Sequence, residues 1–282
     1  MVGKVYLVGA GPGDPKLITI RGLEALRKSD AVVYDRLASP RLLAEAKPGA
    51  DKIYVGKLPD RHTMPQDEIN RLLVELAAQG KTVTRLKGGD PSVFGRVGEE
   101  AEALAAAGIP FEIVPGVTSA IAVPAYAGIP VTHRDYSSSF TVVTGHEKPE
   151  KLDSTVDWEK LARTDTIIFL MGVSRIELIA RRLVEHGRAA DTPVALVRWG
   201  TLPEQATLTG TLADIADRVR AADFQPPAVI VVGRVVRLRE RLAWFERKPL
   251  FGRRILVTRT RAQASELAER IDELGGEPGL FP

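Results

Sequence analysis

The sequence predicts an α/β fold made of two α/β domains, and three observations support this prediction. Short runs of Val, Ile and Leu alternate with helical patterns along the chain, as they do in layered α/β proteins. Glycine-rich loops follow several of these runs. The 282 residues, of which 44% are hydrophobic, exceed the common single-domain size and can fill two cores.

The first domain is expected over residues 1–116. It opens with a strand at 4–8, a glycine loop, a helix at 20–28 and a strand at 31–34, a βαβ pattern that predicts parallel strands. An amphipathic helix is expected at 66–79, and a Pro-Gly turn closes the domain.

The second domain is expected over residues 117–240 and should contain some antiparallel strands. Its apolar runs and helical patterns resume directly after the Pro-Gly turn. The predicted elements are a helix through 120–126, strands at 140–144, 166–171, 193–199, 206–210 and 228–232, and a helix near 212–222.

Residues 241–282 are predicted to be a basic linker and the truncated start of a further domain. A strand at 254–258 and a helix at 264–274 cannot bury a core by themselves. Residues 234–261 hold ten Lys and Arg against two acidic residues, a composition typical of a solvated linker. Because the preceding residues are close to neutral, the basic isoelectric point does not indicate a nucleic-acid partner.

The composition argues against several other classes of protein. No apolar run reaches the roughly 18–20 residues of a membrane span, and the N-terminus has no signal-peptide pattern, so we expect a cytoplasmic protein that does not bind a membrane. The absence of cysteine excludes disulfides and thiolate zinc sites. No metal site is expected, because no ligand-like spacing joins the histidines, which are His62, His133, His146 and His186.

The first glycine loop, from Gly9 to Asp14, partly matches the dinucleotide-binding pattern G-x-G-x-x-G. Asp14 replaces the third glycine, and Pro12 and Pro15 remove backbone donors that a phosphate would need. Asp35, however, ends the second strand where a ribose-binding acid would lie. A nicotinamide-dependent oxidoreductase therefore remains an alternative.

Two further loops are ambiguous when each is taken alone. Asp90 and Pro91 have the pattern of a helix N-cap followed by proline. Thr118 or Ser119 has that of an ordinary cap of the next helix. Neither loop by itself indicates a function.

Taken together and in this order, the loops resemble the tetrapyrrole methylase family, most closely its uroporphyrinogen III C-methyltransferases. The resemblance covers residues 1 to about 240. The matching segments are VGAGPGD at 8–14, VYDRL at 33–37, VGK at 55–57, LKGGDPSVFGR at 86–96, VPGVTSA at 114–120, VTGH at 143–146, FLMG at 169–172 and RWGT at 198–201.

The resemblance implies a cleft between the two domains that binds the methyl donor S-adenosylmethionine and releases S-adenosylhomocysteine. A sulfonium ligand needs backbone polar atoms, one or two acids and an apolar slot for adenine, rather than a basic phosphate cradle. The residues that the resemblance assigns to cofactor binding are Pro12, Gly88, Gly89, Asp90, Val93, Thr118, Ser119, Met171, Gly200 and Ala228.

The resemblance also implies a substrate and catalytic residues. Uroporphyrinogen III would be methylated at two ring carbons to precorrin-2, on the route to sirohaem and cobalamin. Asp35 is implied as the proton acceptor and Lys57 as its proton-handling partner, whereas the alternatives are a strand-terminal cap and a solvated lysine. Because the substrate carries several carboxylates, basic residues should surround it. The candidates are Arg36, Lys57, Arg61, Arg96 and Arg134.

Other functions remain open within and beyond this family. A methyltransferase of the same fold could act on another tetrapyrrole or on RNA, although the nearly neutral body argues against RNA. A noncatalytic binding protein would retain the cofactor without turnover. Family precedent implies a homodimer. Residues 255–278 resemble the opening of uroporphyrinogen III synthase, but most of that domain is absent, so no synthase activity is expected.

Overall fold

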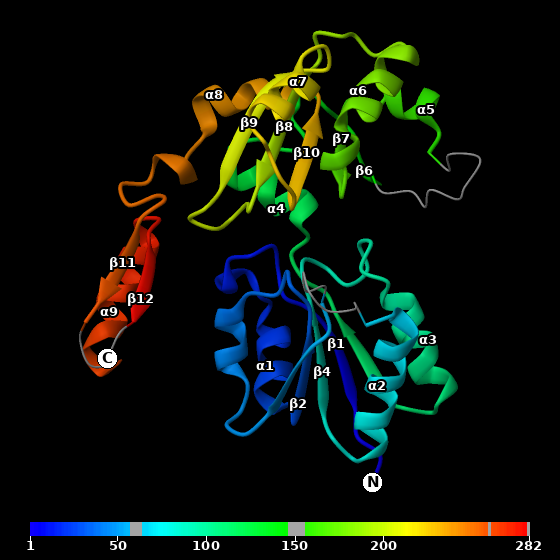
Figure 1. Ribbon diagram of the computed structural model, residues 1–282, viewed down its shortest axis with the longest axis vertical. Helices are drawn as coiled ribbons and strands as arrows, with labels where there is room; N and C mark the ends of the chain where they lie inside the picture. The colour runs from blue at the N-terminus through cyan, green and yellow to red at the C-terminus, as the bar shows by residue number, and fades with distance from the viewer. Residues whose placement is uncertain (57–63, 146–155, 259–260, 281–282) are drawn as a thin grey trace. The chain divides into compact units, whose positions relative to one another are not determined.

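The computed structural model describes residues 1–56, 64–145, 156–258 and 261–280. The chain forms two compact units, Met1–Ser119 and Ala120–Pro282 (Figure 1). Each unit contains a sheet flanked by helices, which confirms the predicted α/β class. The predicted boundaries at 116 and 240 stay a prediction.

The first unit contains a parallel sheet with the strand order β3-β2-β4-β1-β5. The predicted parallel strands are therefore confirmed. The first two strands of the chain, β1 and β2, are not neighbours in the sheet, because β4 lies between them. The strands are β1 (Val5–Gly9), β2 (Ala31–Tyr34), β3 (Asp51–Tyr54), β4 (Val83–Lys87) and β5 (Phe111–Val114), and the helices are α1 (Ile20–Lys28), α2 (Gln66–Ala78) and α3 (Val97–Ala106).

Helices cover both faces of this sheet, with α1 on one face and α2 and α3 on the other (Figure 1). Successive side chains of a strand point to opposite faces. Leu7 therefore packs with Leu73 of α2, whereas Val8 packs with Leu26 of α1. Burial on both faces agrees with the apolar runs of β1 and β2, in which every residue except Tyr6 and Tyr34 is buried.

The second unit contains a mixed sheet with the order β6-β7-β10-β8-β9. The predicted antiparallel strands are confirmed, because β10 is antiparallel to both β7 and β8, and β8 to β9, whereas β6 and β7 are parallel. Its elements are α4 (Ser119–Tyr126), β6 (Phe140–Thr144), α5 (Trp158–Ala162), β7 (Thr166–Leu170), α6 (Ile176–Glu185), β8 (Pro193–Arg198), β9 (Ala206–Thr211), α7 (Ile215–Ala221), β10 (Ala228–Val232) and α8 (Arg239–Leu242).

The basic stretch predicted to be a solvated linker is instead packed over its first half. Val235, Val236 and Phe245 are buried among the basic residues. Arg239 donates to the Ala127 carbonyl and pairs with Glu246. The prediction was wrong here because it was based on the number of charged residues alone. Several of the apolar residues between the arginines point inward and are buried.

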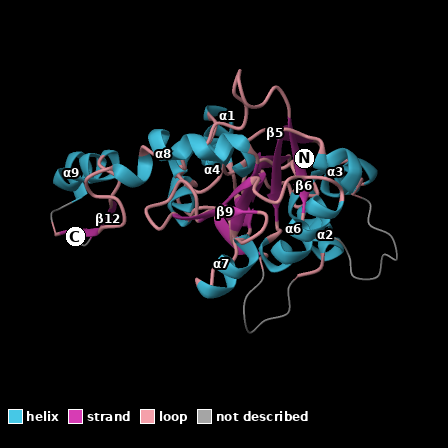
Figure 2. Cartoon of the chain, turned by 90° about the horizontal axis from the view of Figure 1, so that it is seen from above, coloured by secondary structure: helices cyan, strands magenta, loops and turns pink. Residues whose placement is uncertain are grey.

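The C-terminal segment forms β11 (Arg254–Val257), α9 (Arg261–Glu273) and β12 (Glu277–Leu280), and α9 lies beside β12 (Figure 2). The predicted strand and helix are therefore confirmed as β11 and α9, and the structure adds β12, which was not predicted and which pairs in parallel with β11. Pro278 and Gly279 are poor strand formers, so it is pairing rather than propensity that forms this strand. In the described residues, no helix has both the length and the apolar composition of a membrane span.

Candidate functional site

The parallel register of the first sheet brings the loops after β1, β2, β4 and β5 to the same edge. Gly9 is opposite Lys87, and Val8 is opposite Val114. The carboxyl ends of these strands therefore coincide, and in α/β proteins ligands bind at this edge.

Three of these loops are joined to one another. The backbones of Gly11 and Gly89 exchange two hydrogen bonds, of 2.7 and 3.2 Å. The Asp90 carboxylate accepts from the backbone N–H of Gly116 at 2.9 Å and of Ser92 at 2.7 Å. Asp90 caps no helix, because α3 begins only at Val97, so the N-cap interpretation was wrong.

Glycines allow these loops to approach closely. A Cβ on Gly9 would lie 2.5 Å from the Gly116 Cα. A Cβ on Gly88 would lie 2.5 Å from the Leu37 Cβ, in the loop that carries Asp35. Gly89 has a φ of +69°, and the Ser119 nitrogen would lie 3.7 Å from a Cβ on it. The predicted cofactor residues Gly88, Gly89, Asp90, Thr118 and Ser119 are thus brought together, and Pro12 and Val93 lie in the same loops.

Asp35 lies at this edge with both carboxylate oxygens oriented. Its Oδ1 accepts from the Leu37 N–H at 3.1 Å, and its Oδ2 is 3.5 Å from Nη2 of Arg85. The side chain is 28% exposed, which leaves room for a reacting group. Asp35 is therefore placed where a proton acceptor could work.

The predicted basic residues are only partly accounted for. Lys57 and Arg61 lie outside the described residues. Arg96 pairs with Glu99 at 2.8 Å. Arg36 and Arg134 lie within the described residues, and their role stays a prediction.

A buried ionic cluster lies beneath Asp35. Glu100 of α3 is fully buried, and its Oε1 accepts from Lys87 at 2.6 Å and from Arg85 at 3.2 Å. Burial lowers the pKa of the Lys87 ammonium and the Arg85 charge lowers it further, whereas Glu100 and Asp35 oppose this shift. The sequence analysis missed Arg85 and Glu100. The available signal was two basic residues at alternate positions of a buried strand, where charges are rare.

The first loop does not have the geometry of a dinucleotide site. Such a loop should open directly into a helix whose N-terminus binds the phosphates. Here a 3-10 helix at Pro15–Leu17 follows the loop, Asp14 accepts from the Lys16 N–H at 2.9 Å, and α1 begins only at Ile20. The described loop therefore argues against the nicotinamide alternative.

In the second unit, the predicted cofactor residues also meet at one edge of their sheet. Leu170 is opposite Val229, and Ala228 is opposite Arg198. Met171 follows Leu170 and Gly200 follows β8 closely, so both lie at the end where Ala228 begins β10. A Cβ on Gly200 would clash with Val123 of α4, so this glycine also serves close packing.

Strained backbone conformations concentrate in the matched loops of both units. Among the described residues, six that are not glycine have a positive φ, and five of them lie in these loops. Strain of this kind is common at ligand sites. The Met171 side chain is in addition 53% exposed, so it is accessible to a ligand. The five are Phe94, Arg96, Met171, Trp199 and Thr201.

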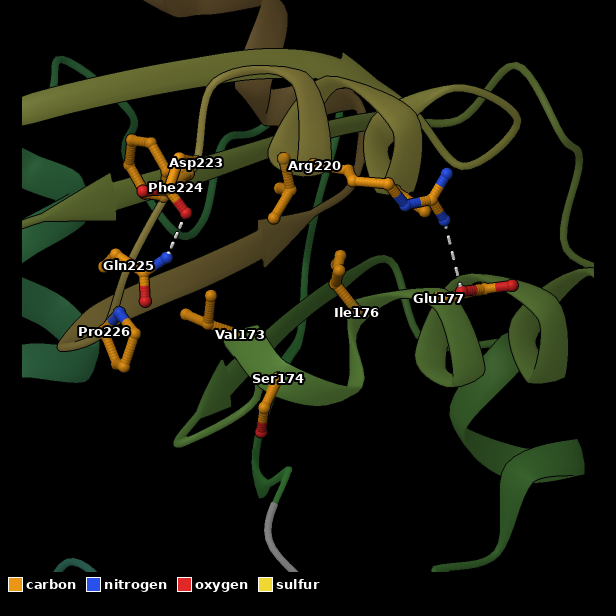
Figure 3. Close-up of a pocket in the computed structure, with 11 residues that line it drawn as sticks. Val173, Ser174, Ile176, Glu177, Arg220, Asp223, Phe224, Gln225 and Pro226 are labelled. Atoms are coloured by element: carbon orange, nitrogen blue, oxygen red, sulfur yellow. Dashed lines mark hydrogen bonds and ion pairs between the residues drawn. The ribbon is translucent and has the colours of Figure 1, made fainter.

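A cavity of about 320 Å³ lies elsewhere in the second unit (Figure 3). Arg220 and Glu177, two of the charged residues that line it, pair with each other at 3.4 Å. Its lining contains none of the predicted site residues, so the cavity does not bear on their assignment. The cavity is lined by Val173, Ser174, Ile176, Glu177, Ala216, Val219, Arg220, Asp223, Phe224, Gln225 and Pro226.

No group of His, Cys, Asp or Glu in the described part of the chain could hold a metal ion.

Comparisons with known proteins agree with this arrangement. The family model described as Tetrapyrrole (Corrin/Porphyrin) Methylases matches residues 4–216. The uroporphyrinogen-III C-methyltransferase of Bacillus subtilis (strain 168) is 50% identical over 276 residues, which are 98% of this chain but 57% of that protein. The enzyme of the same name from Priestia megaterium is 56% identical over 236 residues, which are 83% of this chain and 99% of that protein.

A solved structure is also similar to this chain. It is uroporphyrin-III C-methyl transferase from Thermus thermophilus complexed with S-adenyl homocysteine. The two sequences are 41% identical, the TM-score is 0.72, and the match covers 84% of this chain and all of the other.

The close approach of the glycine loops predicts a cost for added volume. Gly116→Ala should lower the free energy of unfolding by about 1–3 kcal/mol, because its Cβ would meet the Gly89 carbonyl and the Gly9 Cα. Gly98→Ala is the matched control, since nothing lies within 4 Å of its Cβ, and it should leave stability unchanged or raise it by up to about 1 kcal/mol. Denaturant unfolding measures both, and equal effects would contradict the packed geometry.

Proposed function

We propose that this chain, which belongs to the tetrapyrrole (corrin/porphyrin) methylase family, is an S-adenosylmethionine-dependent C-methyltransferase. It methylates two ring carbons of uroporphyrinogen III to give precorrin-2, for sirohaem and cobalamin synthesis. Two relatives at 50% and 56% identity that carry this enzyme's name support the proposal. The chain spans only 57% of one of them, and 99% of the other.

The observation that carries the proposal is the set of joined loops next to Asp35. Gly88 packs against the Asp35 loop, and Gly89 and Asp90 connect the loops after β1 and β5. Backbone amides and carbonyls at this edge suit the polar groups of S-adenosylmethionine. Among the proposed cofactor residues of the second unit, Met171 has an exposed apolar side chain and Ala228 has a small one.

Methyl transfer depends more on the positioning of the two reactants than on a strong base. When bound, S-adenosylmethionine would supply an electrophilic methyl group on a sulfonium. An electron-rich ring carbon of the substrate would take this methyl group while the carbon–sulfur bond breaks and S-adenosylhomocysteine leaves. The loops hold the two reactants in register and exclude water, which lowers the barrier by removing translational and rotational freedom. Asp90 keeps acceptor capacity on both carboxylate oxygens for a ligand amine, because each oxygen that accepts a backbone N–H bond, from Ser92 or from Gly116, has a further lone pair.

Asp35 then accepts a proton from the methylated ring system. After the new carbon–carbon bond forms, the ring carries a positive charge that is relieved when a proton leaves. The partly exposed Asp35 carboxylate is oriented to take this proton. Lys57 is proposed as its proton-handling partner from the family resemblance.

Asp35→Ala should lower methyl transfer about a hundredfold or more, because the proton acceptor is lost. The measurement is anaerobic incubation with uroporphyrinogen III and S-adenosylmethionine, followed by mass spectrometry of the tetrapyrrole. The wild type should add two methyl groups. Asp51→Ala is the matched control. Asp51 is an exposed acid that begins β3, so it lies at the amino ends of the strands, away from Asp35, and it pairs with Lys81. Wild-type protein that binds cofactor without methylating this substrate would refute the assignment.

The division predicted from the sequence is a methylase of two domains, 1–116 and 117–240, followed by a synthase-like segment within 241–282, and we propose the same order with a later end for the second domain. Packing of Phe245 and Glu246 extends the methylase part beyond 240, because Glu246 accepts from Gln205 and Thr207. We therefore place its functional end near residue 250.

A chain ending at Leu250 should keep wild-type methyl transfer, whereas a chain ending at Glu240 should unfold at lower temperature. The shorter chain lacks Phe245, which packs on Tyr126, and the Glu246 hydrogen bonds. Thermal unfolding and the methylation assay compare the two. Equal stability of both truncated chains would place the boundary at 240.

The family resemblance further supports a cytoplasmic homodimer as part of the proposal. Light scattering should therefore give twice the 30.6 kDa of one chain, and cell fractionation should recover the protein with the soluble enzymes. A monomer at micromolar concentration that retains full activity would exclude an obligatory dimer.

A further inference from the structure

The cluster formed by Arg85, Lys87 and Glu100 lies in the interior of the first unit, directly behind Asp35. The side chains of Arg85 and Lys87 are 4% and 6% exposed, and that of Glu100 is 0% exposed. Gln66 of α2 also donates to Glu100, at 3.2 Å. The cluster therefore connects β4, α2 and α3.

The strand register places Asp35 beside this cluster. Val33 of β2 is opposite Arg85 of β4. Alternate residues of a strand share a face, so Asp35 follows Val33 on the face that carries Arg85 and Lys87. Arg85 bridges the two anions, because its Nε donates to Glu100 and its Nη2 approaches Asp35 at 3.5 Å. Its Nη1 donates to the Val33 and Leu86 carbonyls, at 3.4 and 3.2 Å.

Stability alone does not explain these buried charges. Ion pairs are costly to desolvate, and apolar residues of similar size often give an equally stable core. Within the described residues, Oε2 of Glu100 is buried with no hydrogen-bond partner, which adds a further cost. The buried part of the cluster also holds two cations against one carboxylate, so Asp35 supplies the second anion.

We propose that Arg85 is a positioning residue for the reaction: oriented by Glu100, it fixes the Asp35 carboxylate at the carboxyl edge of β2. This inference rests on the proposed function, because it gives Asp35 the role of proton acceptor. One Asp35 oxygen is held by Arg85 and the other by the Leu37 N–H. The plane of the carboxylate is therefore set by two contacts from different elements, and its remaining lone pairs are available to the substrate.

The planar guanidinium is what makes this possible. Arg85 reaches Glu100, two backbone carbonyls and Asp35 at the same time through different N–H groups. A lysine carries the same charge but presents a single ammonium and cannot reproduce this fork. Arg85→Lys therefore separates positioning from charge.

A double-mutant cycle tests the proposal. In the wild-type background, Arg85→Lys should lower kcat by at least about fivefold and leave the affinity for S-adenosylhomocysteine within about twofold. In the Asp35→Ala background, the same change should lower kcat by less than about twofold, because the carboxylate that Arg85 positions is gone. Full and additive losses in both backgrounds would show that Arg85 acts independently of Asp35 and would overturn the inference.

Arg188→Lys is the matched control. Arg188 is a half-buried arginine of the second unit that donates to the carbonyls of Ala162, Thr164 and Asp165. Its loss should lower the unfolding temperature without changing kcat of the folded enzyme, in either background. Thermal unfolding of every variant separates lost structure from lost positioning.

Two further variants keep the test decisive if Arg85→Lys does not fold. Glu100→Gln removes the charge that orients Arg85 and should show the same dependence on Asp35. Asp35→Glu leaves the buried cluster untouched and keeps the charge, but it displaces the carboxylate by one methylene. Its kcat should fall by at least about tenfold if placement matters, whereas near wild-type kcat would overturn the inference.

The outcome also separates this inference from the proposed function. Wild-type protein that fails to methylate uroporphyrinogen III refutes the proposed function by itself. Wild-type activity combined with additive Arg85 and Asp35 effects, or with an active Asp35→Glu variant, refutes only the positioning role.

Discussion

The candidate residues of the first unit depend on one constraint, the parallel arrangement of β1, β2, β4 and β5. In a parallel sheet all carboxyl ends lie at one edge, so loops far apart in the sequence meet there. Gly9 and Lys87 are opposite each other in adjacent strands although 77 intervening positions separate them. The chemistry of the edge is then decided by which residues follow each strand.

The loops at this edge are joined through main-chain groups and through the carboxylate of Asp90. Two hydrogen bonds join Gly11 to Gly89, and Asp90 ties in Gly116. Glycine is needed where a Cβ would enter a neighbouring backbone, as at Gly9 and Gly116. Because these contacts use main-chain groups and the Asp90 carboxylate, other nearby side chains such as that of Val93 remain available for a ligand. The positive φ values of neighbouring residues are the energetic cost of this arrangement.

The sequence predicts the fold class, the glycine loops and the family, because each depends on short contiguous motifs. The packing of Phe245 and the strand β12 were not predictable in this way, since both depend on partners elsewhere in the chain. Arg85 and Glu100 were not predicted as part of the site for the same reason. The charges of Arg85 and Lys87 stand out in a buried strand, but only the α3 crossover, which brings Glu100 over β4, joins them to Glu100. Pairwise contact, not local pattern, defines that part of the site.

The buried cluster also connects the loop after β4, which is proposed to bind the cofactor, to Asp35, the proposed proton acceptor. The loop after β4 begins at Lys87 and leads into α3, which carries Glu100. The 2.6 Å contact between Lys87 and Glu100 therefore closes the base of this loop. The same Glu100 oxygen accepts from Arg85, whose guanidinium reaches Asp35. A displacement of the loop base would move the carboxylate that Arg85 holds, so one buried anion maintains both the loop geometry and the placement of Asp35. This shared dependence explains why the protein keeps these buried charged residues. Their desolvation costs free energy, and an apolar core would fold as well.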